Sequence, residues 1–191
     1  MSAQSKPLTR MIIVAAPSGA GKSSFVERIC KENQQLRDTV TFTTRTMRAG
    51  ESQGHPYHFV SKDEFNLLVA KNYFVEWALV HTNFYGTPLE QLENAWEEGK
   101  CIIMDVDVQG AETFKGKYPD AKTVFILPPS IEELRRRVTK RDGASIADLE
   151  VRMNNAEKEI RVAHTFDYQI VNDDFEGSYL KFKKIVEELL G

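Results

Sequence analysis

Cysteine is scarce in this chain of 191 residues, and no apolar run is long enough to span a membrane. The two cysteines, Cys30 and Cys101, lie in apolar stretches without metal-ligand spacing, which favours reduced core thiols over a disulfide or a zinc site and predicts a cytoplasmic location. The apolar run MIIVAAP at 11–17 is too short for a bilayer, and no signal-peptide core precedes it. We therefore expect neither export nor membrane insertion.

An excess of basic residues is also missing, because the formal net charge is -3. This balance argues against the broad positive surface of a nucleic-acid-binding protein, although a local basic pocket could still bind a small polyanion. With 41% hydrophobic and 28% charged residues, the chain is too ordinary for a disordered or fibrous protein. Its length predicts a single domain, 1–191, with one or two insertions.

The order of apolar and helical patterns predicts an α/β fold with a parallel sheet of the P-loop NTPase type and helices on both faces. Buried strands are expected at 11–16, 101–106, 123–127 and near 168–171, and helices at 22–35, 87–98, 130–141, 145–163 and 174–190. Residues 37–86 are rich in β-formers and aromatics, which indicates an inserted, mainly β lobe. Residues 135–153 form a candidate helical lid, and the core then comprises 8–36, 87–134 and 154–190.

A glycine-rich loop, APSGAGKSSF, joins the first predicted strand to the first predicted helix. Closely spaced glycines let backbone N–H groups surround phosphate oxygens, while Lys22 would reach the β and γ phosphates and the Ser23 hydroxyl would ligate Mg²⁺. The alternative is a plain strand-to-helix turn with a solvated lysine, a poor position for a cation because the helix dipole there favours anions. The predicted ATP-binding residues of the loop are Ala16, Pro17, Ser18, Gly19, Ala20, Gly21, Lys22, Ser23 and Ser24.

Charged residues in three other segments suggest a second substrate. Arg45 and Arg48, three apart in TFTTRTMRAGE, could direct two guanidinium groups at one phosphate, or could simply lie on a solvated surface. Glu76, within the apolar run YFVEWALV, would be costly to bury unpaired, and guanine could supply two N–H donors to it. Asp105 and Asp107 end a buried strand on one face, at the sheet edge where ligands bind.

Together with ILPPS and VNDD, these segments closely resemble the guanylate kinase family, in the same order from about residue 11 to 190. The resemblance implies phosphoryl transfer from ATP to GMP, with Mg²⁺ as cofactor and a role in purine nucleotide metabolism. It assigns Arg45, Arg48, Tyr57 and Tyr85 to the GMP phosphate and Thr41, Glu76, Thr87 and Asp107 to guanine. It also assigns Asp105 to the neighbourhood of Mg²⁺ and the reacting phosphates, where we expect it to orient a ligand of the metal or a water rather than to bind the ion directly.

For the lid, the resemblance assigns Arg141 and Arg152 to catalysis, where their charges would stabilise the transferring phosphoryl group. Arg137 shares a helix face with Arg141 and could bind ATP, or could belong to the solvated face of RRRVTKR. Asn172 would contact adenine, or would cap a turn.

Two other functions fit the same fold. One is a non-catalytic guanylate-kinase-like module that binds peptides; such modules typically lack a working phosphate loop, whereas this chain keeps Lys22 and Ser23. The other is a kinase of the same fold that acts on another phosphorylated substrate. The combination of Thr41, Glu76, Thr87 and Asp107 favours guanine. The expected partners are therefore the small molecules ATP and GMP, with no nucleic acid or membrane.

Overall fold

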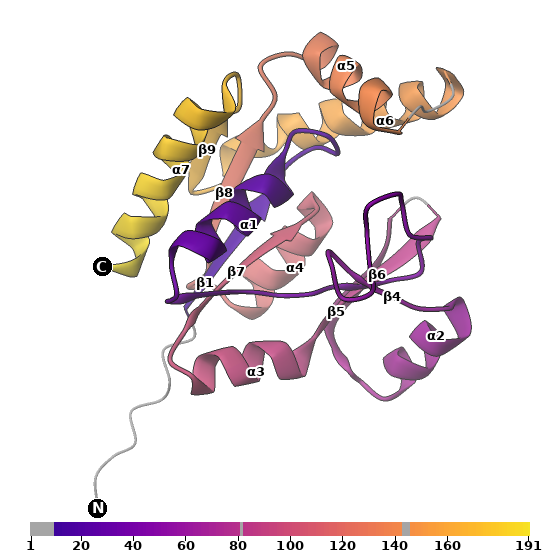
Figure 1. The fold of residues 1–191 in the computed structure, drawn as a ribbon, viewed down its shortest axis with the longest axis vertical. Coiled ribbons are helices and arrows are strands. Elements are labelled where there is room, and N and C mark those ends of the chain that lie inside the picture. The colour runs from indigo at the N-terminus through magenta and orange to yellow at the C-terminus, as the bar shows by residue number, and fades with distance from the viewer. Residues whose placement is uncertain (1–9, 81, 143–145) are drawn as a thin grey trace, which may run out of the picture.

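The architecture comes from a computed structural model, which describes residues 10–80, 82–142 and 146–191. Five parallel strands form the central sheet in the order β2-β7-β1-β8-β9 (Figure 1). Their bounds are Met11–Ala15 for β1, Leu36–Asp38 for β2, Cys101–Val106 for β7, Lys122–Leu127 for β8 and Tyr168–Val171 for β9. The predicted parallel α/β core is confirmed.

Every residue of β1 is apolar, and alternate side chains of a strand point to opposite faces of the sheet. Both faces must therefore be buried, and helices cover each of them. Ile12 and Val14 share a cluster with side chains of α1 (Lys22–Glu32), α5 (Ile131–Asp142), α6 (Ile146–Arg161) and α7 (Phe175–Leu190). Met11, Ile13 and Ala15 join a second cluster with α3 (Leu89–Glu97), α4 (Val108–Lys117) and the 3₁₀ turn Ala163–Thr165. None of the described helices combines the length and the apolar character needed to cross a bilayer.

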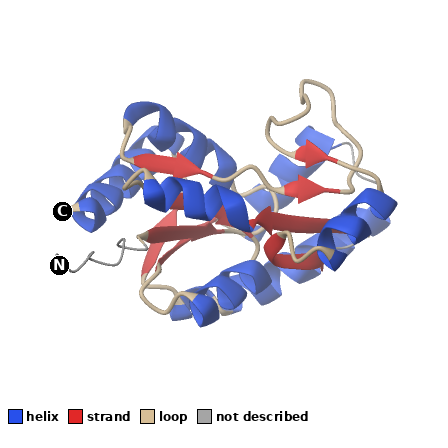
Figure 2. Ribbon diagram, turned by 90° about the horizontal axis from the view of Figure 1, so that it is seen from below, coloured by secondary structure: helices blue, strands red, loops and turns tan. Residues whose placement is uncertain are grey.

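The inserted lobe is a second, four-stranded sheet in the order β4-β3-β6-β5, which lies beside the central sheet (Figure 2). Its elements are β3 (Phe42–Thr43), β4 (His58–Phe59), α2 (Lys62–Ala70), β5 (Phe74–Val80) and β6 (Asn83–Pro88). Phe65 of α2 is fully buried and stacks on Phe74 and Phe84, with ring centroids 4.7 and 5.4 Å away. The lobe therefore has an aromatic core of its own.

Three elements differ from the sequence prediction. Helices α2 and α4 were not predicted, although Ser61 caps α2 and Asp107 caps α4 by accepting hydrogen bonds from the backbone N–H groups of Glu64 and Gly110. Strand β2 pairs with β7 in the central sheet, so the inserted lobe begins after Asp38. The predicted lid corresponds to parts of α5 and α6, and its Val138 and Met153 pack in the core cluster of β1.

Candidate active site

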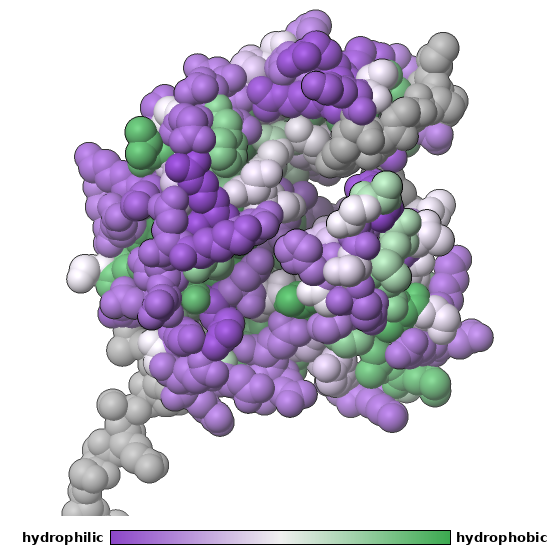
Figure 3. Space-filling view, in the orientation of Figure 1, coloured by the Kyte–Doolittle hydropathy of each residue, from purple (hydrophilic) through white to green (hydrophobic). Residues whose placement is uncertain are grey.

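The surface is hollowed between the α5–α6 pair and the second sheet, and hydrophilic residues line much of this hollow (Figure 3). At its base, a cavity of about 300 Å³ is lined by loop residues and one lid arginine: Gly19, Gly21, Lys22, Ser23, Ser24 and Arg137. Gly19 and Gly21 have φ angles of 94° and 98°, the left-handed region that favours glycine. No side chain caps the start of α1, which suits an anion-binding helix N-terminus.

The α5 helix lies directly against this loop. A Cβ atom placed on Gly19 would come within 2.7 Å of Cγ2 of Val138, so no larger residue fits there without displacing the helix. Loop and lid are thus in direct contact in this structure.

An oxygen-rich pair sits where the loop meets the central sheet. The Ser23 hydroxyl donates a hydrogen bond of 2.5 Å to Oδ2 of Asp105 at the carboxyl end of β7. A hydroxyl and a carboxylate are ligand types that Mg²⁺ accepts, so this pair could hold the ion. Across the described ranges, no three His, Cys, Asp or Glu side chains gather into a metal-binding group.

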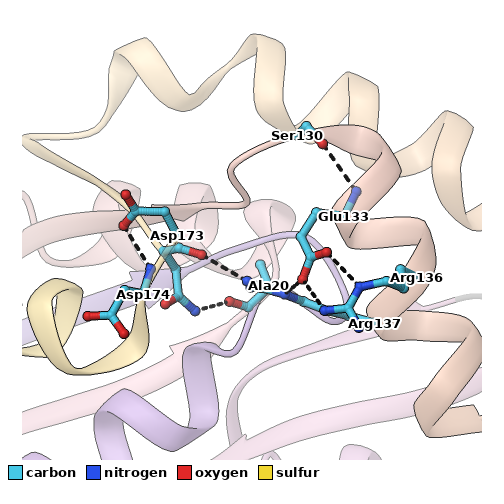
Figure 4. Close-up of polar contacts among 8 residues, drawn as sticks. Ala20, Ser130, Glu133, Arg136, Arg137, Asp173 and Asp174 are labelled. Carbon is cyan, nitrogen blue, oxygen red and sulfur yellow. Dashed lines mark hydrogen bonds and ion pairs between the residues drawn. The ribbon is translucent and has the colours of Figure 1, made fainter.

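Asn172 connects the loop to α5 through Ala20 and Arg137, the two partners that Figure 4 labels. Its side-chain amide donates to the carbonyl of Ala20 at 2.8 Å, and its own backbone carbonyl accepts from Nη2 of Arg137 at 3.1 Å. Glu133, one turn earlier on α5, accepts from Nε of Arg137 at 2.8 Å. Asn172 is buried, and its Oδ1 has no hydrogen-bond partner among residues 10–80, 82–142 and 146–191. The side chain predicted to contact adenine therefore also holds the phosphate loop.

The predicted guanine residues converge on the second sheet and the end of β7. Thr87 of β6 is fully buried, lies opposite Glu76 of β5, and donates a hydrogen bond of 3.1 Å to its carboxylate. Burial raises the pKa of Glu76 to about 7; the Thr87 hydrogen bond opposes this shift and the charge of Asp107 adds to it. Thr41 is half-buried just before β3. Glu76 is thus a largely desolvated carboxyl group that accepts a hydrogen bond from a buried hydroxyl.

The residues predicted for the acceptor phosphate also lie together. Cζ of Arg45 is 5.4 Å from the ring centroid of Tyr57, whose ring lies 5.8 Å from that of Tyr85. Burial raises the pKa of Tyr57 above its usual range, so its hydroxyl remains a donor at neutral pH. Arg48 is exposed in the turn that follows. Glu51 lies in the same turn, and its carboxylate accepts hydrogen bonds from Arg45. Sequence reasoning missed Glu51.

Comparisons with known proteins identify the family. The sequence profile described as guanylate kinase matches residues 8–189. The guanylate kinase of Bdellovibrio bacteriovorus is 66% identical over 182 residues, covering 95% of this chain and 98% of the relative. That of Syntrophotalea carbinolica is 43% identical, covering 92% and 84%. The crystal structure of guanylate kinase from Anaplasma phagocytophilum has a TM-score of 0.77 at 31% identity, covering 96% and 87%.

This chain belongs to the guanylate kinase family. The sequence resemblance is thereby confirmed.

The lid arginines of this guanylate kinase family member are only partly described. Arg152 is half-buried on α6. The side chain of Arg141, the other predicted lid arginine, lies outside the described residues. Arg137 lines the loop cavity, and its binding of ATP stays a prediction.

Two half-buried carboxyl groups near the site were not singled out from the sequence. Burial raises the pKa of Asp38 to about 7, and the charge of Asp105 adds to this shift. Burial likewise raises the pKa of Glu159 to about 7, opposed by the charge of Lys22. Both lie in segments without a recognisable motif, and only the folded chain brings them near the loop and β7.

Proposed function

We propose that this protein transfers the γ-phosphoryl group of ATP to GMP, yielding ADP and GDP, within purine nucleotide metabolism and GMP recycling. Membership in the guanylate kinase family supports this reaction. The observation that carries it is the desolvated carboxylate of Glu76 beside the buried hydroxyl of Thr87, in a chain that also has a phosphate loop. A carboxylate accepts both N1–H and the N2 amine of guanine, whereas adenine offers no such pair.

On the donor side, the loop residues from Ala16 to Ser24 would bind the ATP phosphates through backbone N–H groups, and Lys22 would neutralise the β and γ phosphates. Arg137 would add positive charge from the lid, because it lines the same cavity. Asn172 would orient the loop through Ala20 and offer its unpartnered Oδ1 to the adenine amine.

Mg²⁺ would bind at Ser23, with Asp105 accepting a hydrogen bond in the second shell; the 2.5 Å contact between their oxygens supports this pairing. When bound, the ion would supply positive charge that offsets the charge of the phosphates. Asp105 would hold the Ser23 hydroxyl in place for this role.

On the acceptor side, Arg45, Arg48, Tyr57 and Tyr85 would bind the GMP phosphate, and Thr41, Thr87, Glu76 and Asp107 would read guanine. Arg48 would also stabilise the transferring group. Arg141 and Arg152 would approach that group when the lid of residues 135–153 closes over the core and the GMP-binding lobe, excluding water from the reaction.

Acceptor selectivity tests the proposed reaction. A coupled assay of ADP release with ATP and Mg²⁺ would compare GMP, dGMP, AMP, UMP and CMP, and we expect GMP to give a much higher kcat/KM than AMP, UMP or CMP. A preference for another acceptor would favour a different kinase of this fold. The absence of turnover with every acceptor would favour a non-catalytic interaction module.

The raised pKa of Glu76 predicts a pH dependence of GMP binding. The carboxylate form accepts the guanine donors, and a pKa of about 7 means that this form is lost as pH falls through neutrality. We expect KM for GMP to rise by about tenfold per pH unit below pH 6.5 while KM for ATP changes much less. In E76Q this dependence should disappear, since no carboxyl group remains at residue 76 to titrate. An unchanged pH profile in E76Q would contradict the assignment.

The proposed location is the cytoplasm. Cys30 and Cys101 are both free thiols, and burial raises their pKa values to about 12 and about 11. Such thiols are unreactive core groups, as expected in a reducing compartment.

A further inference from the structure

The guanidinium of Arg45 is bound by a carboxylate of the same turn. Its Nη2 donates to Oε1 of Glu51 at 2.7 Å and its Nη1 to Oε2 at 3.0 Å. The side chains of Arg45 and Glu51 are only 12% and 15% exposed, so this is a largely buried, two-bond ion pair. Burial alone would lower the pKa of Arg45, but the hydrogen bonds that it donates to Glu51 and the negative charge of that carboxylate together outweigh burial and raise the pKa.

The same carboxylate also fixes the main chain of the second arginine. Oε2 of Glu51 accepts the backbone N–H of Arg48 at 2.7 Å, and the backbone N–H of Glu51 donates back to the carbonyl of Arg48. One side chain thus closes the turn between Arg48 and Glu51 and binds Arg45 at the same time.

The ion pair leaves one edge of Arg45 available. A guanidinium has two edges that can bind an anion with two hydrogen bonds, Nη1/Nη2 and Nε/Nη2. Glu51 takes the first edge, and the second hydrogen of Nη1 is donated to the carbonyl of Thr46 at 2.7 Å. Among the described residues, Nε of Arg45 has no acceptor. The orientation of the Arg45 guanidinium is further restricted by Tyr57 and Phe59, whose ring centroids both lie 5.4 Å from its Cζ.

We propose that Glu51 is a positioning residue for acceptor binding: it holds the Nη1/Nη2 edge of Arg45 and the main chain of Arg48, so that the Nε/Nη2 edge of Arg45 is presented to the phosphate of GMP. This inference rests on the proposed function, because it assumes GMP as the acceptor. A carboxylate that occupied the phosphate position itself would have to leave on binding. Glu51 instead binds the Nη1/Nη2 edge of Arg45, so the Nε/Nη2 edge can bind the phosphate while Glu51 stays in place.

The test compares E51Q with a matched control, E98Q. Glu98, the C-cap residue of α3, also pairs with an arginine, Arg37, but this pair is exposed and neither residue is assigned to a substrate. Glutamine keeps one acceptor oxygen and turns an N–H₂ group toward a donor, so the two hydrogen bonds to Nη1 and Nη2 of Arg45 cannot both persist. We expect E51Q to raise KM for GMP by about tenfold or more and to leave KM for ATP within about twofold, while E98Q changes neither.

A double-mutant cycle distinguishes positioning from general destabilisation. If Glu51 acts mainly through Arg45, then adding E51A to R45A should raise KM for GMP by less than about threefold, although E51A alone raises it by about tenfold. Thermal unfolding of each variant reports the fold. If E51Q does not fold, E51D, which keeps the carboxylate on a shorter stem, should show the same selective rise in KM for GMP.

Two outcomes would overturn the proposal. An unchanged KM for GMP in folded E51Q would show that Arg45 needs no orientation by Glu51. A lowered KM would show that the carboxylate competes with the phosphate. If the wild-type protein does not phosphorylate GMP, the proposed function fails on its own, and calorimetric binding of GMP to wild type and E51Q still decides the role of Glu51.

Discussion

Replacing Lys22 with alanine is expected to lower kcat for phosphoryl transfer by about a thousandfold or more, with the fold intact. Lys22 begins α1 and lines the cavity of the glycine loop, where we propose that the transferring group is bound. Helix formation does not depend on it, because alanine is the strongest helix former. The measurement is single-turnover transfer to GMP, together with thermal unfolding.

The matched control is K31A. Lys31 lies in the last turn of the same helix, where it is exposed and pairs with Glu27 four residues earlier. Losing such a pair costs little stability and should leave kcat unchanged. Near-normal turnover in folded K22A would rule out the proposed role of Lys22.

The second large effect concerns the choice of nucleotide. E76Q is expected to reduce the ratio of kcat/KM for GMP over AMP by about tenfold to a hundredfold, because guanine donors lose a charged acceptor and meet an amide N–H₂ group. The fold should not suffer. The pKa of Glu76 is raised in the folded protein, so its ionised form is disfavoured there and its contribution to stability falls as pH rises through about 7. The neutral glutamine of E76Q avoids the unfavourable burial of an ionised carboxylate.

E93Q provides the comparison for E76Q, because Glu93 is an exposed carboxylate of α3. Its substitution should alter neither selectivity nor stability. Selectivity that is equal in E76Q and wild type would show that guanine is recognised elsewhere.

The core of the fold was predictable because its signals are local. The apolar run of β1, the glycine loop and the helical spacing of α1 follow one another within 22 residues and give a strand, a turn and a helix without reference to the rest of the chain. Helix α2 had a local signal too, a capping box from Ser61 to Glu64, but the aromatic β-formers on either side outweighed it. Asp107 was interpreted only as a ligand, which concealed its second role as the cap of α4.

The parts of the site that the sequence did not reveal depend on contacts between distant segments. Asn172 reaches Ala20 because β9 pairs with β8 and β8 with β1, which brings two residues 152 positions apart into hydrogen-bond range. No periodicity encodes such a contact. Glu51 is only six residues from Arg45, yet its role follows from the path of the turn, whose Gly50 has a φ of 85°. The family resemblance predicted which residues belong to the site, whereas the folded structure was needed to show which residues they contact.

The close approach of Gly19 to Val138 has a consequence for how this protein can change over evolution. A larger residue at position 19 would be unfavourable for two reasons: the positive φ angle of Gly19 and the contact with Val138 of α5. Similarly, a bulkier residue at 138 would press on the loop. The two segments, more than a hundred residues apart, are thus expected to be inherited together, and chimaeras that take the loop from one relative and α5 from another should fail where these side chains do not match.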